Sequence, residues 1–449
     1  MSGLRNAVLA TSAWLAVQAA CAGAFQQAFD AAQQNDPTYR AARHELASAA
    51  QNVPMARAGL EPNVSLSLSD ARVTGSRTAD NFLGQEVTTP LDYRSPQTTL
   101  SVRAPLLNME ATQRYRQALV QLEYAQTLFA VRTHELLERL GQAYLQRLFA
   151  EQGVQLARSQ LAGIREQRQL ALRRFELGDG TRPEVRQAEA DLALAQVQLA
   201  DAEYQLATAR LALAQITGPT PIPLQPVTDT HVMPPLAPAS LEYWMEQAEA
   251  RNPAVLARRH AVELARLGVA RARAGHYPRI DLVGSISKGR NDSVSTLNQT
   301  LSQRSIGVQL NLPLYSGGYV DASVLQAMAE QDKAQAELDA ELQRVSAELN
   351  RAFLTVATGA DRLAAQYQAL QASRLVREGA SKSVAGGIGI TADVVRADVK
   401  VAETTRDLAR AHHEQVLARL RLYARSGKAP EEIVQILDGL LSTPTPGAP

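Results

Sequence analysis

The sequence is poor in the residues that build cross-linked or thick globular domains. Its 449 residues include one cysteine, Cys21, and only 5% aromatic side chains. A single cysteine cannot form an intrachain disulfide bond, and a composition with so few aromatic side chains suits long helices better than a large core. The 46 basic and 45 acidic residues give a net charge of +1. This balance argues against a nucleic-acid-binding protein, which usually carries a basic excess.

Proline and long apolar runs are also missing over much of the chain. After the first 25 residues there is no run of about 18 apolar residues, so we expect no transmembrane helix. No proline occurs between Pro105 and Pro183, or between Pro313 and Pro430. About 70 helical residues at 1.5 Å per residue would reach about 100 Å. No compact domain needs that length, so these stretches predict a coiled-coil shaft.

Sequence patterns typical of enzymes are missing as well. The seven histidines are scattered, and His412 and His413 are adjacent, so on a helix they would point about 100° apart and would not chelate a metal together. The sequence has no phosphate-binding loop of the G-x-x-x-x-G-K type and no nucleophile elbow. We therefore predict a protein that is not an enzyme and that uses no cofactor, metal or nucleic acid.

The first 24 residues resemble a secretory signal peptide. Arg5 precedes a short apolar run from Ala7 to Ala20, and the small residues that follow fit an A-x-A cleavage rule after Ala22 or Ala24. The alternative interpretation is a buried N-terminal helix. Acylation of Cys21 as a lipid anchor is a second alternative, although Gln18 stands where such signals have an apolar residue. We expect the mature protein to leave the cytoplasm.

The rest of the chain contains an internal duplication. Pro37 and Pro62 are 25 residues apart, as are Pro253 and Pro278, and "GDGTRPEVRQA" from Gly178 aligns with "GIGITADVVRA" from Gly387. Repeats of this kind indicate a duplicated structural unit. We predict a first repeat at 25–218, a proline-rich linker at 219–240, a second repeat at 241–427, and a C-terminal segment with a disordered tail at 428–449.

Heptad patterns follow in both repeats and predict paired helices. In the first, large residues recur every seven positions and small residues three positions later, a pattern that allows close packing of helices. The large set is Val185, Leu192, Leu199, Leu206 and Leu213, and the second set is Ala188, Ala195, Ala202, Ala209 and Ile216. The second repeat keeps the register with Val394, Val401 and Leu408, although Gln415 and Arg425 weaken it.

Short alternating segments precede each long helix. Val64, Leu66 and Leu68 alternate with serines, and Ile280, Leu282 and Ile286 repeat the pattern. We expect four strands per chain, joined by polar loops at 71–97 and 289–304. Nothing apolar in these loops would cover the apolar face of the strands, so a barrel with lipid outside and water inside fits the pattern.

Four strands cannot enclose a channel, because the diameter of a barrel grows with strand number. An open edge in lipid would leave backbone groups unpaired, so identical chains must share their strands, and three chains would supply twelve. The turns from strand to helix are expected at proline and glycine residues, with Tyr277, Tyr315 and Tyr319 near the membrane surface. The junction residues are Pro62, Pro105, Pro278, Pro313, Gly317 and Gly318.

The order and duplication of these motifs resemble the TolC family of outer-membrane channel proteins. The features that carry the resemblance are "LNLPLYSGG", "FELGDGTRPEVRQAEADL", "GGIGITADVVRADV" and repeats that end in "ITG" and "RSG". The resemblance implies an α+β membrane protein: a homotrimeric 12-stranded β-barrel, four strands per chain, continued by an α-helical coiled-coil barrel in the periplasm of a Gram-negative bacterium. It also implies two partners beside outer-membrane lipid, a periplasmic adaptor (membrane-fusion) protein and an inner-membrane ABC transporter or proton-driven pump.

The resemblance also implies a gate at the periplasmic end. Asp393 occupies the first acidic position of the family's constriction, but Arg396 replaces a second acid, and Glu184 matches an acid that links neighbouring coils in the closed state. We expect Arg396 or Lys382 to pair with Glu184, and Asp398 to be a solvated surface charge. Charged rings at a narrow constriction act as an electrostatic filter.

The function that we expect is passive conduction of a secreted polypeptide in type I secretion, since no lipid anchor is apparent. One alternative is the same duct serving multidrug or small-molecule efflux. A second is a periplasmic coiled-coil adaptor without a pore, although an adaptor would not need two strand pairs each placed between long helices.

Overall fold

The computed structural model describes residues 23–80, 82–219, 222, 233–293 and 296–441. These residues form two compact units. The described residues of 23–44, 127–256 and 340–441 belong to unit 1, and those of 45–126 and 257–339 belong to unit 2, so the division falls within helices α3, α5, α8 and α9. Residues 1–22 of the predicted signal peptide, with Cys21, lie outside the described residues. The described part begins at Gly23, and Ala24 starts the first helix.

The order of elements confirms the predicted duplication. The first repeat has the helices α2 (Ala24–Asn35), α3 (Pro37–Ala50) and α4 (Asn52–Ala58), the strands β1 (Asn63–Asp80) and β2 (Glu86–Leu107), and the helices α5 (Met109–Glu176) and α6 (Arg182–Thr217). The second has α7 (Leu241–Arg251), α8 (Pro253–Arg273), a 3-10 turn (Ala274–His276), β3 (Arg279–Ser293), β4 (Thr296–Asn311), α9 (Tyr319–Ala385) and α10 (Thr391–Arg425). The two long helices contain 68 and 67 residues, as the missing prolines predicted.

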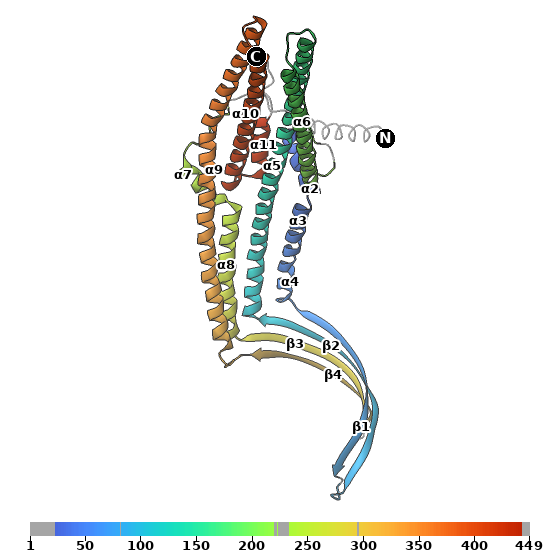
Figure 1. Ribbon diagram of the computed structural model, residues 1–449. Helices are drawn as coiled ribbons and strands as arrows, with labels where there is room; N and C mark the ends of the chain where they lie inside the picture. The colour runs from blue at the N-terminus through green and yellow to red at the C-terminus, as the bar shows by residue number, and fades with distance from the viewer. Residues whose placement is uncertain (1–22, 81, 220–221, 223–232, 294–295, 442–449) are drawn as a thin grey trace, which may run out of the picture. The chain divides into compact units, whose positions relative to one another are not determined.

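The four strands form one antiparallel sheet in the order β1-β2-β3-β4, seen side by side and curved in Figure 1. The prediction of polar loops at 71–97 and 289–304 was wrong, because most of these residues extend the strands into long hairpins. Arg72 pairs with Asp92 at 2.8 Å, and the Thr78 and Thr88 hydroxyls lie 2.8 Å apart. Gly84, with φ of +74°, lies in the turn. Cross-strand polar pairs and the backbone ladder contribute to the stability of these strand ends.

The residues of the coiled-coil seam predicted on α6 are buried or half-buried. None of its ten residues is exposed, and Ala195, Ala209 and Leu213 are buried. On α9, Leu349, Val356, Leu363 and Leu370 are buried at intervals of seven. Both helices therefore bury a heptad stripe, and on α6 it is the stripe that the sequence predicted.

Gln415, which weakened the heptad register of α10, has a structural role. Its side chain is buried, and its Nε2 donates a hydrogen bond to the Val356 carbonyl oxygen on α9 at 2.9 Å. Gly359 lies opposite, and a Cβ there would come within 1.9 Å of Gln415 Oε1. A glycine thus makes room for a polar side chain in the α9–α10 seam.

Each repeat ends on a glycine that packs against the start of the same repeat. Gly218 (φ +81°) lies against Asn35, whose Nδ2 donates to the Thr217 carbonyl at 3.0 Å. Gly427 (φ +79°) lies against Arg251, and the next residue, Asn252, donates to the Arg425 carbonyl at 2.8 Å. These asparagines satisfy carbonyls that helix ends leave unpaired.

The segment after the second repeat contains a helix that the sequence analysis did not predict. Helix α11 (Pro430–Leu441) begins with a proline and two glutamates and buries Ile433, Val434, Leu437 and Leu441. Proline at the first helical position and acidic residues in the first turn both favour a helix start. The Asp438 carboxylate accepts hydrogen bonds from the Phe25 and Gln26 backbone N–H groups at 2.9 and 3.1 Å. Residues 442–449 of the predicted tail lie outside the described residues.

No α-helix in the described part of the chain combines the length and the apolar character that a membrane-spanning helix requires. The described part of the linker, residues 219, 222 and 233–240, contains no helix or strand, as expected for a proline-rich segment. Trp244 of α7 is buried beside it, and its indole N–H donates to the Pro238 carbonyl at 2.9 Å.

Replacement of Gly427 by alanine is expected to destabilise the fold by about 1–3 kcal/mol, because alanine disfavours a positive φ. A Cβ would also meet the Arg251 backbone at 2.5 Å. Gly379→Ala is the matched control: this helical glycine has nothing within 4 Å, and alanine there should stabilise by about 0.5–1 kcal/mol. Thermal unfolding in detergent measures both, and equal effects would contradict the account.

Acidification is expected to destabilise unit 1 through His412 and His413 on α10. Both are buried, His413 packs edge-on against Phe149 at 5.6 Å, and burial lowers the pKa of each to about 4. The unfolded chain binds these protons near pH 6.5 and the folded chain does not, so the contribution is complete above pH 6.5 and is lost as pH falls toward 4. At ~1.4 kcal/mol per pKa unit the two together are worth on the order of 7 kcal/mol.

Unfolding by denaturant between pH 7 and pH 4 tests this expectation. The double variant His412→Gln/His413→Gln should show a flatter pH dependence than the wild type over the same range. An identical slope in both proteins would show that other groups control the acid sensitivity.

Candidate functional site

The sheet has two chemically different faces, as the alternating pattern predicted. The register aligns Val64, Val102, Gly284 and Ile306 in one row across the four strands, and the next row aligns Ser65, Ser101, Ser285 and Ser305. Val64 and Ile306 are exposed by 63% and 82%. In the serine row, Ser65 and Ser101 lie 2.7 Å apart, and Ser285 and Ser305 lie 2.8 Å apart. One face is therefore apolar and uncovered in the single chain, and the other is polar.

A buried carboxylate lies on the polar face near the start of β3. Asp281 is 6% exposed and accepts hydrogen bonds from Arg279 at 3.0 Å, with Arg103 of β2 at 4.0 Å. Asp281 aligns with Pro105, where β2 has a bulge. Two arginines thus compensate one acid on the face that carries the serine row.

The junction prolines and glycines do not all lie where the sequence analysis expected. Pro62 and Pro278 immediately precede β1 and β3, and Pro313 lies two residues beyond β4, so these three mark strand ends. Pro105 instead lies inside β2 at the bulge, since a proline has no N–H for the ladder and is tolerated in bulges. Gly317 and Gly318 have φ of +63° and +78° immediately before α9.

The first repeat makes the corresponding turn without glycine. Asn108 follows β2, and its Oδ1 accepts a hydrogen bond from the Ala111 N–H at 3.0 Å, which caps α5. The predicted aromatic positions in the second repeat, Tyr277, Tyr315 and Tyr319, are exposed by 56%, 88% and 74%. Exposed tyrosines next to strand ends fit a membrane-surface position, which stays a prediction.

Glu184, predicted to form part of the gate, caps its own helix in this structure. Its Oε2 accepts a hydrogen bond from the Thr181 N–H at 3.0 Å at the start of α6. A carboxylate in the first turn is also stabilised by the helix dipole. This local role was not recognised from the sequence, although the T-x-x-E spacing is typical of a capping box.

The other charged residues at this end also have local partners. Arg396 Nη2 lies 3.1 Å from Asp393 Oδ1, Lys382 pairs with Glu378 at 2.7 Å, and Arg377 pairs with Asp398 at 2.7 Å. Neither expected pair with Glu184 forms within this chain. Asp393 and Arg396 lie one turn apart on α10, as predicted, and compensate each other's charge.

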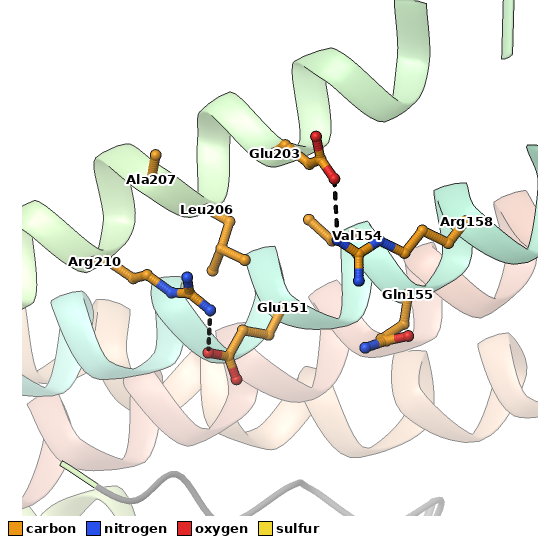
Figure 2. A pocket seen from close by; sticks show the side chains of 8 residues that line it. All are labelled: Glu151, Val154, Gln155, Arg158, Glu203, Leu206, Ala207 and Arg210. Carbon is orange, nitrogen blue, oxygen red and sulfur yellow. Dashed lines mark hydrogen bonds and ion pairs between the residues drawn. The ribbon is translucent and has the colours of Figure 1, made fainter. Parts of the chain in front are cut away.

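A surface groove between α5 and α6, shown in Figure 2, was not anticipated from the sequence. It has a volume of about 510 Å³. Arg158 of α5 pairs with Glu203 of α6 at 3.0 Å, and Arg210 of α6 pairs with Glu151 of α5 at 3.5 Å. Leu206 and Ala207 lie between these two ion pairs in sequence and line the groove. Among the described residues no group of three or more His, Cys, Asp or Glu could hold a metal ion.

An amphipathic sheet with two open edges, joined to paired long helices in two copies, defines the protein as an outer-membrane channel of the TolC type. The model of the family described as "Outer membrane efflux protein" matches residues 28–219 and 244–428, one match per repeat. The chain belongs to this family. It is therefore a protein of the Gram-negative outer membrane that extends into the periplasm.

Two relatives are similar along most of their length. The alkaline protease secretion protein AprF of Pseudomonas aeruginosa is 32% identical over 399 residues, which cover 87% of this chain and 82% of AprF. The proteases secretion protein PrtF of Dickeya chrysanthemi is 32% identical over 414 residues, which cover 90% of this chain and 88% of PrtF. Both are named for protein secretion and neither is named as an enzyme.

Solved structures share the fold. A membrane protein from Pseudomonas aeruginosa superposes with a TM-score of 0.76 at 20% identity, covering 90% of each chain. CusC, described in terms of transmembrane channel formation, superposes with a TM-score of 0.75 at 18% identity, covering 90% of this chain and 92% of its own. The predicted fold class, an α+β membrane protein of two repeats with four barrel strands per chain and a coiled-coil extension, is confirmed.

Substitution of Glu184 by alanine is expected to loosen the start of α6, because the Thr181 N–H loses its acceptor. Loss of a cap costs about 0.5–2 kcal/mol. The rate of hydrogen–deuterium exchange in the 176–186 segment measures this loosening. Glu189→Ala, which removes only an exposed ion pair with Arg186, should leave this segment unchanged, and equal acceleration in both variants would contradict a capping role.

Proposed function

We propose that the protein is the outer-membrane exit duct of a tripartite export machine and that it passively conducts a secreted polypeptide. The observation that carries this proposal is the sheet, with an uncovered apolar face, a serine row on the other face, and edge strands β1 and β4 whose outer edges pair with no other strand within the described part of the chain. An apolar outside and a polar inside are what a water-filled barrel in lipid requires.

Three copies complete the barrel in this proposal. In the bilayer core, unpaired backbone groups cost several kcal/mol each, so β4 of one chain pairs with β1 of the next. Twelve strands leave a lumen, whereas about eight are filled by their own side chains. We further propose that residues 1–24 are removed as a signal peptide, as export to the outer membrane requires.

The names of AprF and PrtF support a secreted protein as cargo. Small-molecule efflux is the second candidate, supported by the outer membrane efflux protein BepC of Brucella suis, which is 26% identical over 64% of this chain. The match to the two protease secretion proteins is longer and closer than the match to BepC, and this favours a polypeptide over a small molecule as the cargo. The scaffold without a pore is disfavoured, because such a protein would expose the apolar sheet face to water.

The partners in this proposal are a periplasmic adaptor and an inner-membrane pump, an ABC transporter for a polypeptide cargo. The α5–α6 groove supports the adaptor part of the proposal. Its charged rim and apolar floor suit a partner helix that lays its apolar face between two charged edges.

Deletion of the gene in its source bacterium tests the proposed cargo class. Under the proposal a protein disappears from the culture medium and accumulates in the cell, while sensitivity to dyes and antibiotics stays within about twofold of the parent. Restoration by the wild-type gene is the control. Unchanged secretion together with raised drug sensitivity would reject polypeptide export in favour of efflux.

Ala207→Trp tests the adaptor groove. The indole fills the groove without entering the α6 seam, so secretion should fall at least about tenfold while single-channel conductance stays unchanged. Thr208→Trp, exposed on the same helix but outside the groove lining, is the matched control. Normal secretion by the Ala207 variant would exclude this groove as the docking surface.

We propose that Asp393, Arg396 and Glu184 belong to the periplasmic gate. Arg396 compensates the charge of Asp393 in each chain. Arg396→Ala should therefore raise the cation-to-anion permeability ratio several-fold, because the unpaired Asp393 carboxylates of the three chains attract cations at a constriction. Asp393→Ala should lower the ratio below the wild-type value. Reversal potentials in planar bilayers measure both, with Lys400→Ala as the control, and unchanged ratios in both variants would reject the gate assignment.

A further inference from the structure

A second groove lies within unit 2, between α4, α5 and α8. Its volume is about 600 Å³. Its polar lining consists of two arginines and three amides, and its apolar lining consists of small or aliphatic residues. The residues that matter here are Asn52, Arg114, Gln117, Gln121, Leu264 and Arg271. Among the lining residues there is no carboxylate, so the groove presents hydrogen-bond donors with a net positive charge.

Gln117 holds one of the two arginines in place. Its Nε2 donates to the Leu264 carbonyl oxygen of α8 at 3.3 Å, and its Oε1 accepts from Arg271 Nη1 at 3.1 Å. One amide thus links α5 to α8 and orients the guanidinium at the groove. Among the described residues Arg271 pairs with the Gln117 amide and with no carboxylate. Its remaining N–H groups can donate to an anion.

Arg114 supplies a second guanidinium from α5. It pairs with Glu110 at 2.8 Å through one nitrogen, and its side chain remains 61% exposed. The helices α4, α5 and α8 that line the groove are basic, although the neighbouring α9 supplies Glu337 to Arg258 of α8. Over the segments 52–61, 109–123 and 257–273 there are eight arginines and four glutamates. This local excess favours an anion in the groove.

In the proposed barrel, on which this inference rests, the position of the groove along the chain puts it next to the membrane surface. Arg114 follows the end of β2 by seven residues, and Arg271 precedes the start of β3 by eight. At 1.5 Å per helical residue both lie within about 12 Å of the strand ends. The headgroup layer of a bilayer extends about 5–8 Å beyond the hydrocarbon on each side. A long arginine side chain spans the remaining distance.

We propose that this groove binds the phosphate of an anionic phospholipid headgroup from the leaflet that adjoins the helices. Arg271 and Arg114 bind the phosphate oxygens, Asn52 and Gln121 donate to the glycerol or phosphate oxygens, and Met55 and Leu264 contact the first carbons of the lipid. Guanidinium groups match phosphate oxygens in geometry and charge. Basic pockets beside membrane-spanning segments bind anionic lipids in the same way.

Lipid titration of the purified full-length oligomer tests the proposal. The protein is delipidated in neutral detergent and titrated separately with short-chain phosphatidylglycerol, short-chain phosphatidylcholine and inorganic phosphate, with binding measured calorimetrically. We expect phosphatidylglycerol to bind at least about tenfold more tightly than either of the other two. Arg271→Gln and Arg114→Gln should each weaken it about tenfold. Arg273→Gln, on the same helix but outside the groove, should change it less than twofold.

Three results would overturn the proposal. Equal affinity for phosphatidylglycerol and inorganic phosphate would mean an anion site that does not recognise lipid. Equal weakening by Arg271→Gln and Arg273→Gln would mean diffuse surface charge. Absence of binding in the folded wild-type oligomer would mean no site. Oligomeric state and single-channel conductance are recorded on the same samples, so a failure of this proposal is distinguishable from a failure of the proposed channel function.

Discussion

The backbone hydrogen bonds of a sheet in lipid must all be satisfied, and the rest of this structure depends on that constraint. The chain contributes four long antiparallel strands, and the outer edges of β1 and β4 have no partner strand within the described residues. In water such edges bind solvent, but in the bilayer core they have no alternative partner. The exposed valine, leucine and isoleucine row on one face and the serine row on the other place this sheet at the boundary between lipid and water. A single chain is therefore incomplete, and its copies must pair edge to edge.

Duplication explains how one chain supplies both strand hairpins and both coiled-coil pairs. The two copies use different local chemistry at equivalent places. The turn into α5 uses an asparagine cap, whereas the turn into α9 uses two glycines with positive φ. Each repeat ends in the same way, with a glycine of positive φ that packs against the end of an earlier helix. Gly218 packs against the end of α2, and Gly427 packs against the end of α7. The glycine and asparagine that meet at the end of each repeat have thus been kept between the copies, whereas the turns from strand to helix have diverged.

The sequence predicted the long helices better than it predicted the hydrogen-bond and ion-pair partners of single side chains. Heptads and the absence of proline placed α5, α6, α9 and α10, because both signals extend over many residues. The strand ends at 71–97 were mistaken for loops, because polar residues such as the Arg72–Asp92 pair interrupt the apolar alternation there. Helix α11 was missed in a short segment, although its proline and glutamates are start signals. For the gate, spacing placed Asp393 beside Arg396, but the capping role of Glu184 depends on a backbone N–H that side-chain patterns do not reveal.

The molecular mass of the protein extracted in mild detergent tests the central claim most directly. Light scattering that separates the detergent contribution should give three chain masses, and the same particles should conduct ions in a planar bilayer. A stable monomer with an intact sheet by circular dichroism would show that the edge strands need no partner, and would contradict the account.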